Sequence, residues 1–299
     1  MRDHARSTRL RRSTAATALL ACAALLAGCT GDDDGPSSKS GTSGAKRPAV
    51  KPTPTWDTRP GSIASVGDSI TRGYDACSVL SDCPEASWST GLDVDSLAKR
   101  LLPNPQQHTW NYAETGALMA DLPAQLQTAT VKRPELVTVM IGANDACRDS
   151  VAEMTSVEDF RADFTASLTA LRRALPKTQV YVASVPDLKR LWSEGRKDPV
   201  RRQVWKLGIC PVMLRDPQST HDRANERRDQ VQQRVRDYNT VLRDVCGKLV
   251  LCRYDQAVHR YRFTGDELSK WDWFHPSKEG QQKLADLAYQ EISRRETHA

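Results

Sequence analysis

Residues 136–145 of the chain read LVTVMIGAND, six apolar or β-branched residues followed by a glycine and a polar turn. A short apolar run of this kind predicts a strand that is buried on both faces, as in a parallel sheet. Similar runs at 63–66 and 179–184 predict two further strands. Weaker runs at 108–112 and 249–254 predict two more.

Helical patterns lie between these runs. Apolar residues spaced three or four apart form one face over 160–175 and another over 231–245. Pro276 and Ser277 can start a last helix over 284–292. The alternation of strands and helices predicts an α/β fold whose parallel sheet is covered on both faces. In such sheets the functional site lies at the carboxyl ends of the strands.

Residues 188–225 break this alternation. They are rich in Arg and Pro, and we expect an insertion with one helix near 201–207. The insertion carries Trp192 and Trp205, which either pack inside it or wall a pocket for an acyl chain or a sugar.

The first 28 residues have the composition of an export signal. Several Arg precede an apolar run from Ala15 to Ala27, which is too short for an ordinary membrane-spanning helix. The run ends in Leu26-Ala27-Gly28-Cys29, which resembles the lipobox of bacterial lipoproteins. We therefore predict a lipoprotein signal peptide at 1–28 and lipidation of Cys29, with a plain signal peptide as the alternative.

The next segment, 29–58, is rich in Asp, Gly, Ser, Lys and Pro. Such a composition cannot bury a core, so we expect a flexible tether. The remaining residues, 59–299, are expected to form one globular domain outside the cytoplasm.

The charge balance argues against a nucleic-acid partner. The 299 residues carry a formal net charge of +6, but residues 1–28 hold five Arg and one Asp. The rest of the chain has 38 basic and 36 acidic side chains, which gives no electrostatic footprint for a nucleic acid. The sequence has no phosphate-binding loop, dinucleotide fingerprint or H-E-x-x-H motif. We expect no cofactor, a monomer, and membrane contact only through the N-terminal lipid anchor.

Six cysteines follow the signal and the lipobox. An even number outside the cytoplasm is typical of disulfides, and six cysteines allow fifteen sets of three bridges. Cys77 and Cys83 are close in sequence, as are Cys246 and Cys252, so each pair can form a local bridge. Cys147 and Cys210 are then left to pair with each other. A zinc site is the alternative, but the spacing is wide and no His clusters alongside, so we expect no metal.

Three polar motifs stand where strands end or the last helix begins. Gly67-Asp68-Ser69-Ile70 follows the first strand, Gly142-Ala143-Asn144-Asp145 follows a later one, and Asp272-Trp273-Phe274-His275 precedes the last helix. Alone, the first is more often only a helix cap, the second is usually a tight turn, and an isolated histidine is more often a surface or buried structural residue. Together they would bring a nucleophile, a carboxylate and a base to one edge of the sheet.

These motifs, with Gly116 between the first two, resemble blocks I, II, III and V of the SGNH (GDSL-type) hydrolase family. The resemblance covers about 63–292, with Ile70 in place of the usual Leu, and it is strongest to secreted bacterial esterases. It implies a three-layer α/β/α domain that resembles flavodoxin.

The resemblance also implies the catalytic roles. Ser69 would be the nucleophile, His275 the base and then the acid, and Asp272 the carboxylate that orients His275. The backbone N–H groups of Ser69 and Gly116 and the side-chain amide of Asn144 would form the oxyanion hole.

The expected function is hydrolysis of carboxylic esters, of lipids or other acyl esters, through an acyl-Ser69 intermediate at the cell surface. One alternative is the removal of O-acetyl groups from a polysaccharide by the same fold. The other is a non-catalytic surface lipoprotein that binds a glycan. The insertion tryptophans and the expected anchoring at a membrane slightly favour a lipid substrate.

Overall fold

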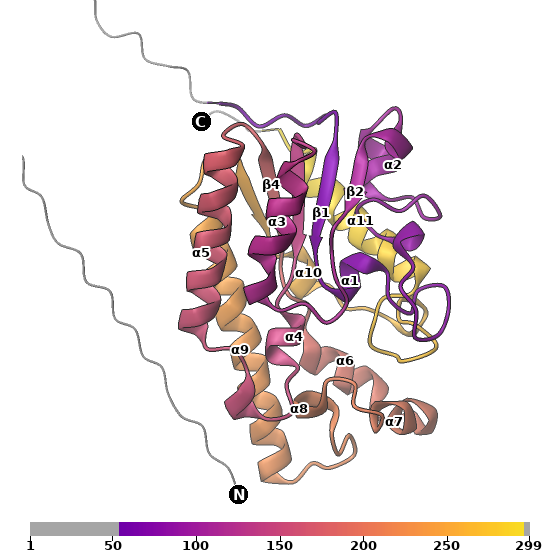
Figure 1. Cartoon of the computed structure of the whole chain (residues 1–299). Helices are drawn as coiled ribbons and strands as arrows, with labels where there is room; N and C mark the ends of the chain where they lie inside the picture. Colours follow the sequence, from indigo (N-terminus) through magenta and orange to yellow (C-terminus); the bar gives the residue numbers. More distant parts are fainter. Residues whose placement is uncertain (1–53, 296–299) are drawn as a thin grey trace, which may run out of the picture. The chain divides into compact units, whose positions relative to one another are not determined.

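The computed structural model describes residues 54–295 of the chain, so the predictions for 1–28, for Cys29 and for most of the tether lie outside the described residues. Within 54–295 the strands form one parallel sheet in the order β2-β1-β3-β4-β5 (Figure 1). The strands are β1 (Ile63–Gly67), β2 (Thr109–Asn111), β3 (Leu136–Met140), β4 (Gln179–Ala183) and β5 (Cys252–Asp255). The predicted α/β fold class is therefore confirmed.

Helices cover both faces of the sheet. On one face α3 packs against β1 and α5, and α5 packs against α9; on the other, α11 packs against α2, β4 and β5 (Figure 1). The α-helices are α1 (Ser69–Arg72), α2 (Leu97–Leu101), α3 (Leu122–Thr130), α4 (Ala143–Ala146), α5 (Val157–Ala174), α6 (Leu188–Gly195), α7 (Pro199–Trp205), α8 (Pro211–Leu214), α9 (Asp222–Cys246), α10 (Ala257–Arg260) and α11 (Lys278–Ile292). The 3-10 turns are η1 (Pro84–Ala86), η2 (Pro105–Gln107), η3 (Met119–Asp121), η4 (Val151–Glu153) and η5 (Gly265–Glu267).

The three central strands are buried along their whole length. This burial explains why they read as continuous apolar runs, since both faces of each strand contact helices. The register pairs Val66 with Val139 and Gly67 with Met140. The loops after β1 and β3 therefore emerge side by side, and these loops carry two of the three polar motifs.

The predicted edge strands differ slightly from the structure. Residues 249–251, expected at the start of the last strand, form a turn in which Leu251 has a φ of +59°. The chain must reverse there, because α9 runs to Cys246 and a disulfide joins Cys246 to Cys252, where β5 begins.

The insertion contains three complete helices, α6, α7 and α8, between residues 188 and 214, and not the one helix that was expected. The helix predicted near 201–207 begins earlier, at Pro199, because the Asp198 side chain caps it by accepting from the N–H groups of Val200 and Arg201. The insertion also ends sooner than expected, since α9 already begins at Asp222.

Disulfides tie the loops of the described domain. They join Cys77 to Cys83, Cys147 to Cys210, and Cys246 to Cys252. The Cys147–Cys210 bridge fixes the insertion to the segment that follows α4. Among residues 54–295, no helix has the length and apolar character needed to cross a membrane.

Candidate active site

A tight strand-to-helix turn positions Ser69. β1 ends at Gly67, whose φ is +143°, and a Cβ there would lie 2.0 Å from the carbonyl oxygen of Met140. Asp68 caps α1 by accepting a 3.0 Å hydrogen bond from the N–H of Ile70. Ser69 is the first residue of α1 and is 5% exposed. Its hydroxyl is therefore held at the carboxyl end of β1.

His275 and Asp272 meet Ser69 from the other end of the chain. The Oγ atom of Ser69 lies 2.8 Å from Nε2 of His275. Nδ1 of His275 forms an ion-paired hydrogen bond with Oδ2 of Asp272. An ionised carboxylate can only accept, so Nδ1 carries the proton and Nε2 accepts from the serine hydroxyl. The structure thus joins the three predicted residues in one chain of hydrogen bonds.

Backbone donors fix the orientation of Asp272. Its Oδ1 accepts hydrogen bonds from the N–H groups of Phe274, at 2.9 Å, and His275, at 3.0 Å. The ring of Tyr74 lies 5.0 Å from the His275 ring, centroid to centroid. The carboxylate and the imidazole are consequently held by contacts on several sides.

The charges around the imidazole suit a base. Burial disfavours the charged form of His275, but the Asp272 carboxylate outweighs this effect and raises the pKa of His275. Burial likewise opposes ionisation of Asp272, yet His275 and the two backbone N–H groups lower the pKa of Asp272. Asp272 is therefore ionised, and its negative charge favours the protonated form of His275.

The loops of Gly116 and Asn144 lie beside Ser69. The N–H of Glu114 donates to the carbonyl of Gly67 at 3.1 Å, which draws the Gly116 loop against the end of β1. Gly116 has a φ of +86°, and nothing lies within 4 Å of a Cβ added there. One N–H of the Asn144 amide donates to the carbonyl of Ala117 at 3.0 Å. This bond joins the two loops and uses only one of the two N–H groups of the Asn144 amide.

Two residues that contact this site, Asp75 and Trp205, belong to none of the sequence motifs. Asp75 is buried beside Asp272 and His275, with potential ligand atoms of all three within 4.8 Å of one another. The indole N–H of Trp205 donates to the backbone carbonyl of Asp272 at 3.0 Å. Both contacts join segments that are far apart in the chain. The only sequence feature that pointed to the Trp205 contact was the presence of tryptophans in the insertion.

Trp192 borders a cavity of about 490 Å³ that shares no lining residue with the cavity beside Asp75, and Trp205 lines neither of them. Trp192 is 8% exposed and Trp205 2% exposed. The indole N–H of Trp192 is used by the carbonyl of Pro217, at 3.0 Å. Trp205 therefore gives no support to the preference for a lipid substrate, which also relied on the expected membrane anchor.

Two groups of side chains between residues 54 and 295 have the proximity of metal ligands. In one, Cys77 and Cys83 are already joined as a disulfide beside Glu85, so they offer no thiolate. The other is Asp75, Asp272 and His275, where the ion pair with Asp272 already occupies Nδ1 of the imidazole.

The model of the GDSL-like lipase/acylhydrolase family matches residues 63–288 of the chain. The chain belongs to this family. The match spans both ends of the site, from the strand before Ser69 to the helix after His275. As a GDSL-like acylhydrolase, the chain is a carboxylic ester hydrolase.

Solved structures are similar to this GDSL-like acylhydrolase. A mutant of Axe2, an acetyl-xylooligosaccharide esterase from Geobacillus stearmophilus, is 17% identical with a TM-score of 0.50, covering 81% of this chain and 99% of its own. TesA is 14% identical with a TM-score of 0.47, and the alignment covers 77% of this chain and 97% of TesA. A family two carbohydrate esterase from Clostridium thermocellum, solved with cellohexaose, is 18% identical with a TM-score of 0.48, covering 78% and 63%. No curated protein matches the chain.

Proposed function

We propose that this hydrolase works through an acyl-Ser69 intermediate. His275 takes the proton of Ser69 as Oγ attacks the ester carbonyl carbon, and then gives that proton to the alcohol that leaves. Water, deprotonated by His275, then attacks the acyl carbon; the bond to Oγ of Ser69 breaks, the acid leaves, and His275 returns the proton to Oγ. The observation that carries the proposal is the hydrogen-bonded chain from Ser69 through His275 to Asp272, with 2.8 Å between Oγ and Nε2.

The negative charge that develops on the carbonyl oxygen of the substrate needs hydrogen-bond donors to stabilise it. We assign this role to the backbone N–H groups of Ser69 and Gly116 and to the second amide N–H of Asn144. The open space above Gly116 and the anchoring of Asn144 on Ala117 support this assignment. Donors held in advance lower the barrier because they need not reorganise during the reaction.

Polar cavities flank the proposed triad. A cavity of about 780 Å³ lies between the Cys77 loop (residues 74–83) and the His275 loop (residues 269–277). Its lining includes charged side chains of both signs and two tryptophans: Asp75, Arg201, Asp266, Lys270, Trp271, Trp273, Lys278 and Glu279. A second cavity, of about 450 Å³, is lined by Arg72, Asp82, Tyr112, Glu114, Thr115 and Gln125, among others.

This lining suits an ester whose alcohol is polar and rich in hydroxyl groups, and not a long acyl chain. Many donors and acceptors can hydrogen-bond hydroxyls, and an exposed indole such as that of Trp271 can pack against the apolar face of a sugar ring. We therefore propose short acyl esters of polar alcohols, sugars included, as substrates. The acetyl-xylooligosaccharide esterase supports only the fold, since the two chains are 17% identical.

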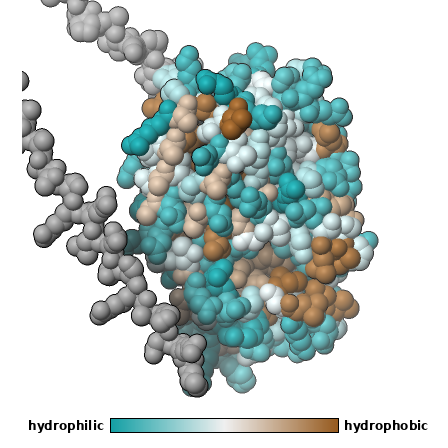
Figure 2. All heavy atoms as spheres, in the orientation of Figure 1, coloured by the Kyte–Doolittle hydropathy of each residue, from teal (hydrophilic) through white to brown (hydrophobic). Residues whose placement is uncertain are grey.

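Lipid esters are the second candidate. Val79 and Leu80 are 54% and 77% exposed on the Cys77 loop, which borders the larger cavity. Exposed apolar side chains next to an active site can contact a lipid surface. The face of the molecule in Figure 2 is mostly hydrophilic, with several apolar areas.

An acyl-chain series tests both candidates. The full chain with Cys29→Ala is assayed on p-nitrophenyl esters from acetate to palmitate, beside the same chain with Ser69→Ala. We expect activity on the shortest esters, which Ser69→Ala abolishes, and activity on an acetylated oligosaccharide. An optimum at long chains would select lipid esters, and an active Ser69→Ala variant would overturn the acyl-serine route.

We also propose that the protein works outside the cytoplasm, anchored through Cys29. The disulfides in the described domain support an oxidising compartment. Cys29→Ala should release the protein from the membrane fraction. Full release of the unmodified protein into the medium would contradict the anchor.

A further inference from the structure

The carboxyl group of Asp75 lies against the proposed triad, although no motif includes it. Asp75 is 2% exposed, and its carboxyl group lies close to that of Asp272. Potential ligand atoms of Asp75, Asp272 and His275 lie within 4.8 Å of one another. A second buried carboxyl group this close to a catalytic carboxylate must affect its charge and its orientation.

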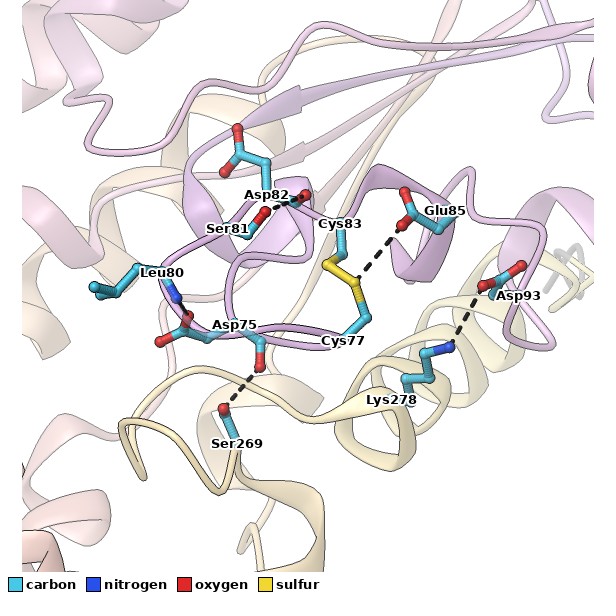
Figure 3. The surroundings of a disulfide bond; sticks show 10 residues. All are labelled: Asp75, Cys77, Leu80, Ser81, Asp82, Cys83, Glu85, Asp93, Ser269 and Lys278. Atoms are coloured by element: carbon cyan, nitrogen blue, oxygen red, sulfur yellow. Dashed lines mark hydrogen bonds and ion pairs between the residues drawn. A yellow bond between two sulfur atoms is a disulfide. The ribbon is translucent and has the colours of Figure 1, made fainter.

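The Cys77 loop holds Asp75 in this place. Its backbone N–H donates to the carbonyl of Ser81 at 3.0 Å, and its carboxylate accepts from the N–H of Leu80. Asp75 itself has a φ of +57°, a conformation that needs support from its surroundings. The disulfide between Cys77 and Cys83 closes the loop that supplies these contacts (Figure 3).

Ser269 joins this loop to the His275 loop. Its hydroxyl donates to the carbonyl of Asp75 at 2.7 Å, as Figure 3 shows. Its backbone N–H donates to the carbonyl of His275 at 2.8 Å. Asp75 and His275 are therefore both hydrogen-bonded to Ser269. Because Ser269 is itself buried, it holds the Asp75 carboxyl group close to that of Asp272.

The two carboxyl groups differ in their partners. Asp272 has the imidazole and two backbone N–H groups, which favour its ionised form. Burial, and then the charge of Asp272, raise the pKa of Asp75 to about 6. Of the two, Asp75 is thus the group that holds a proton in mildly acidic solution, and its O–H can donate to the Asp272 carboxylate.

Other charged and titratable groups also surround this pair. Tyr74 and Asp82 lie on the same loop, and Asp68 acts on His275 from the end of β1. The cavity that Asp75 lines is also bordered by Arg201, Asp266, Lys270, Lys278 and Glu279. Asp75 and Asp68 both raise the pKa of His275, but of the two it is Asp75 that groups with Asp272 and His275 within 4.8 Å.

We propose that Asp75 is a positioning residue, whose carboxyl group beside Asp272 and His275 sets, through its charge, the pH at which His275 can accept the proton of Ser69. This inference rests on the proposed triad. When Asp75 ionises, its negative charge favours the imidazolium, so His275 becomes a neutral base only at higher pH. Asn at this position cannot ionise, but its amide can still donate to Asp272.

The test is the pH profile of kcat/KM on p-nitrophenyl acetate, measured with the full chain carrying Cys29→Ala. In Asp75→Asn we expect the acid limb to move to lower pH by about one unit, since a charge within 4–6 Å shifts a pKa by this much or more. In Asp75→Ala, which removes the same charge, we expect the acid limb to move in the same direction as in Asp75→Asn.

Asp266→Asn is the matched control, because it removes an exposed carboxylate from the border of the same cavity. Its acid limb should coincide with that of the unchanged protein. Melting temperatures of all variants show whether Asp75 affects only folding. A folding defect alone would lower the amount of active protein but would not move the acid limb of the pH profile.

Ser69→Ala, assayed in parallel, separates the two proposals. If Ser69→Ala is inactive and the Asp75→Asn profile coincides with the unchanged one, the role of Asp75 is overturned and the triad stands. If Ser69→Ala keeps its activity, both are overturned.

Discussion

The indole N–H of Trp205 donates a 3.0 Å hydrogen bond to the backbone carbonyl of Asp272. Trp205 belongs to the insertion, and a Cβ at Gly195 in α6 would lie 2.2 Å from its ring. From the same helix as Trp205, Arg201 places its guanidinium 3.9 Å from the ring centre of Trp273. The insertion therefore packs directly against the backbone that presents Asp272 and His275.

Trp205→Phe tests this support. The substitution keeps an aromatic ring but leaves the buried carbonyl of Asp272 without its donor, which costs about 1–3 kcal/mol. We expect a lower melting temperature together with a lower kcat on p-nitrophenyl acetate. Trp56→Phe is the control, since it removes a similar bond, 2.9 Å to the carbonyl of Ile292, at the end of α11. It should lower the melting temperature and leave kcat unchanged; equal kinetic losses in both would contradict a specific role for Trp205.

Asp272→Asn should nearly abolish turnover while keeping the fold. The Asn side-chain oxygen can still accept from the N–H groups of Phe274 and His275, but the charge that stabilises the imidazolium is gone. We expect a loss of about 10⁴ in kcat, as for this change in other Ser-His-Asp triads. Because the Asp272 carboxylate raises the pKa of His275, an NMR titration of the imidazole should give a lower pKa in the variant. A loss smaller than tenfold would indicate that His275 works without Asp272.

Asn144→Ala should slow the chemical step. Removal of one oxyanion donor costs about 10²–10³ in kcat, and KM should change little, since the donor acts on charge that develops during the reaction. The alanine variant also loses the bond to Ala117, so Asn144→Asp, which keeps a polar group of the same shape but cannot donate when ionised, is measured beside it. Full activity in both variants would remove Asn144 from the oxyanion hole.

Asp68 should make the protein less stable as the pH rises. Burial raises the pKa of Asp68 from 3.8 to about 7, and its Oδ2 is a buried acceptor that lacks a hydrogen-bond partner in the described residues. Between these two values the native state keeps a proton that the unfolded chain has released, so the free energy of unfolding falls as pH rises from about 4 to about 7. In Asp68→Asn the melting temperature should fall less over this range. The exposed Asp93→Asn serves as the control, and equal pH dependence in all three proteins would contradict the prediction.

Opening the Cys147–Cys210 bridge should cost more stability than opening either short bridge. The closed loop spans 63 residues, against six for Cys77–Cys83. Loop entropy predicts a cost of about 4 kcal/mol for the long loop and about 2 kcal/mol for the short one. Urea unfolding of the two double Cys→Ser variants measures both values. Equal costs would show that strain or residual structure, and not loop length, decides the effect.

The local sequence was sufficient to predict the layers of the fold and the position of the chemistry. Apolar runs at β1, β3 and β4 signal strands that are buried on both faces, and the stripes on α5 and α9 are buried as their spacing predicts. Ser69, Asn144 and His275 lie within a few residues of these elements or of the last helix, so the carboxyl edge of the sheet could be inferred from strand direction and the motifs. The edge strand β5 was less predictable, because a turn at Leu251 and not the apolar pattern sets its start.

The sequence by itself determined the α/β class, the family and the residues of the proposed triad, because periodicity and short motifs record how neighbouring residues fold. The tertiary structure alone decided that Asp75 lies against Asp272, that Trp205 supports the same residue, and that the insertion tryptophans are buried. Asp75 and Asp272 are almost two hundred residues apart. Whether such side chains meet depends on the paths of long loops and on the bridges that fix them, and no local pattern encodes those paths.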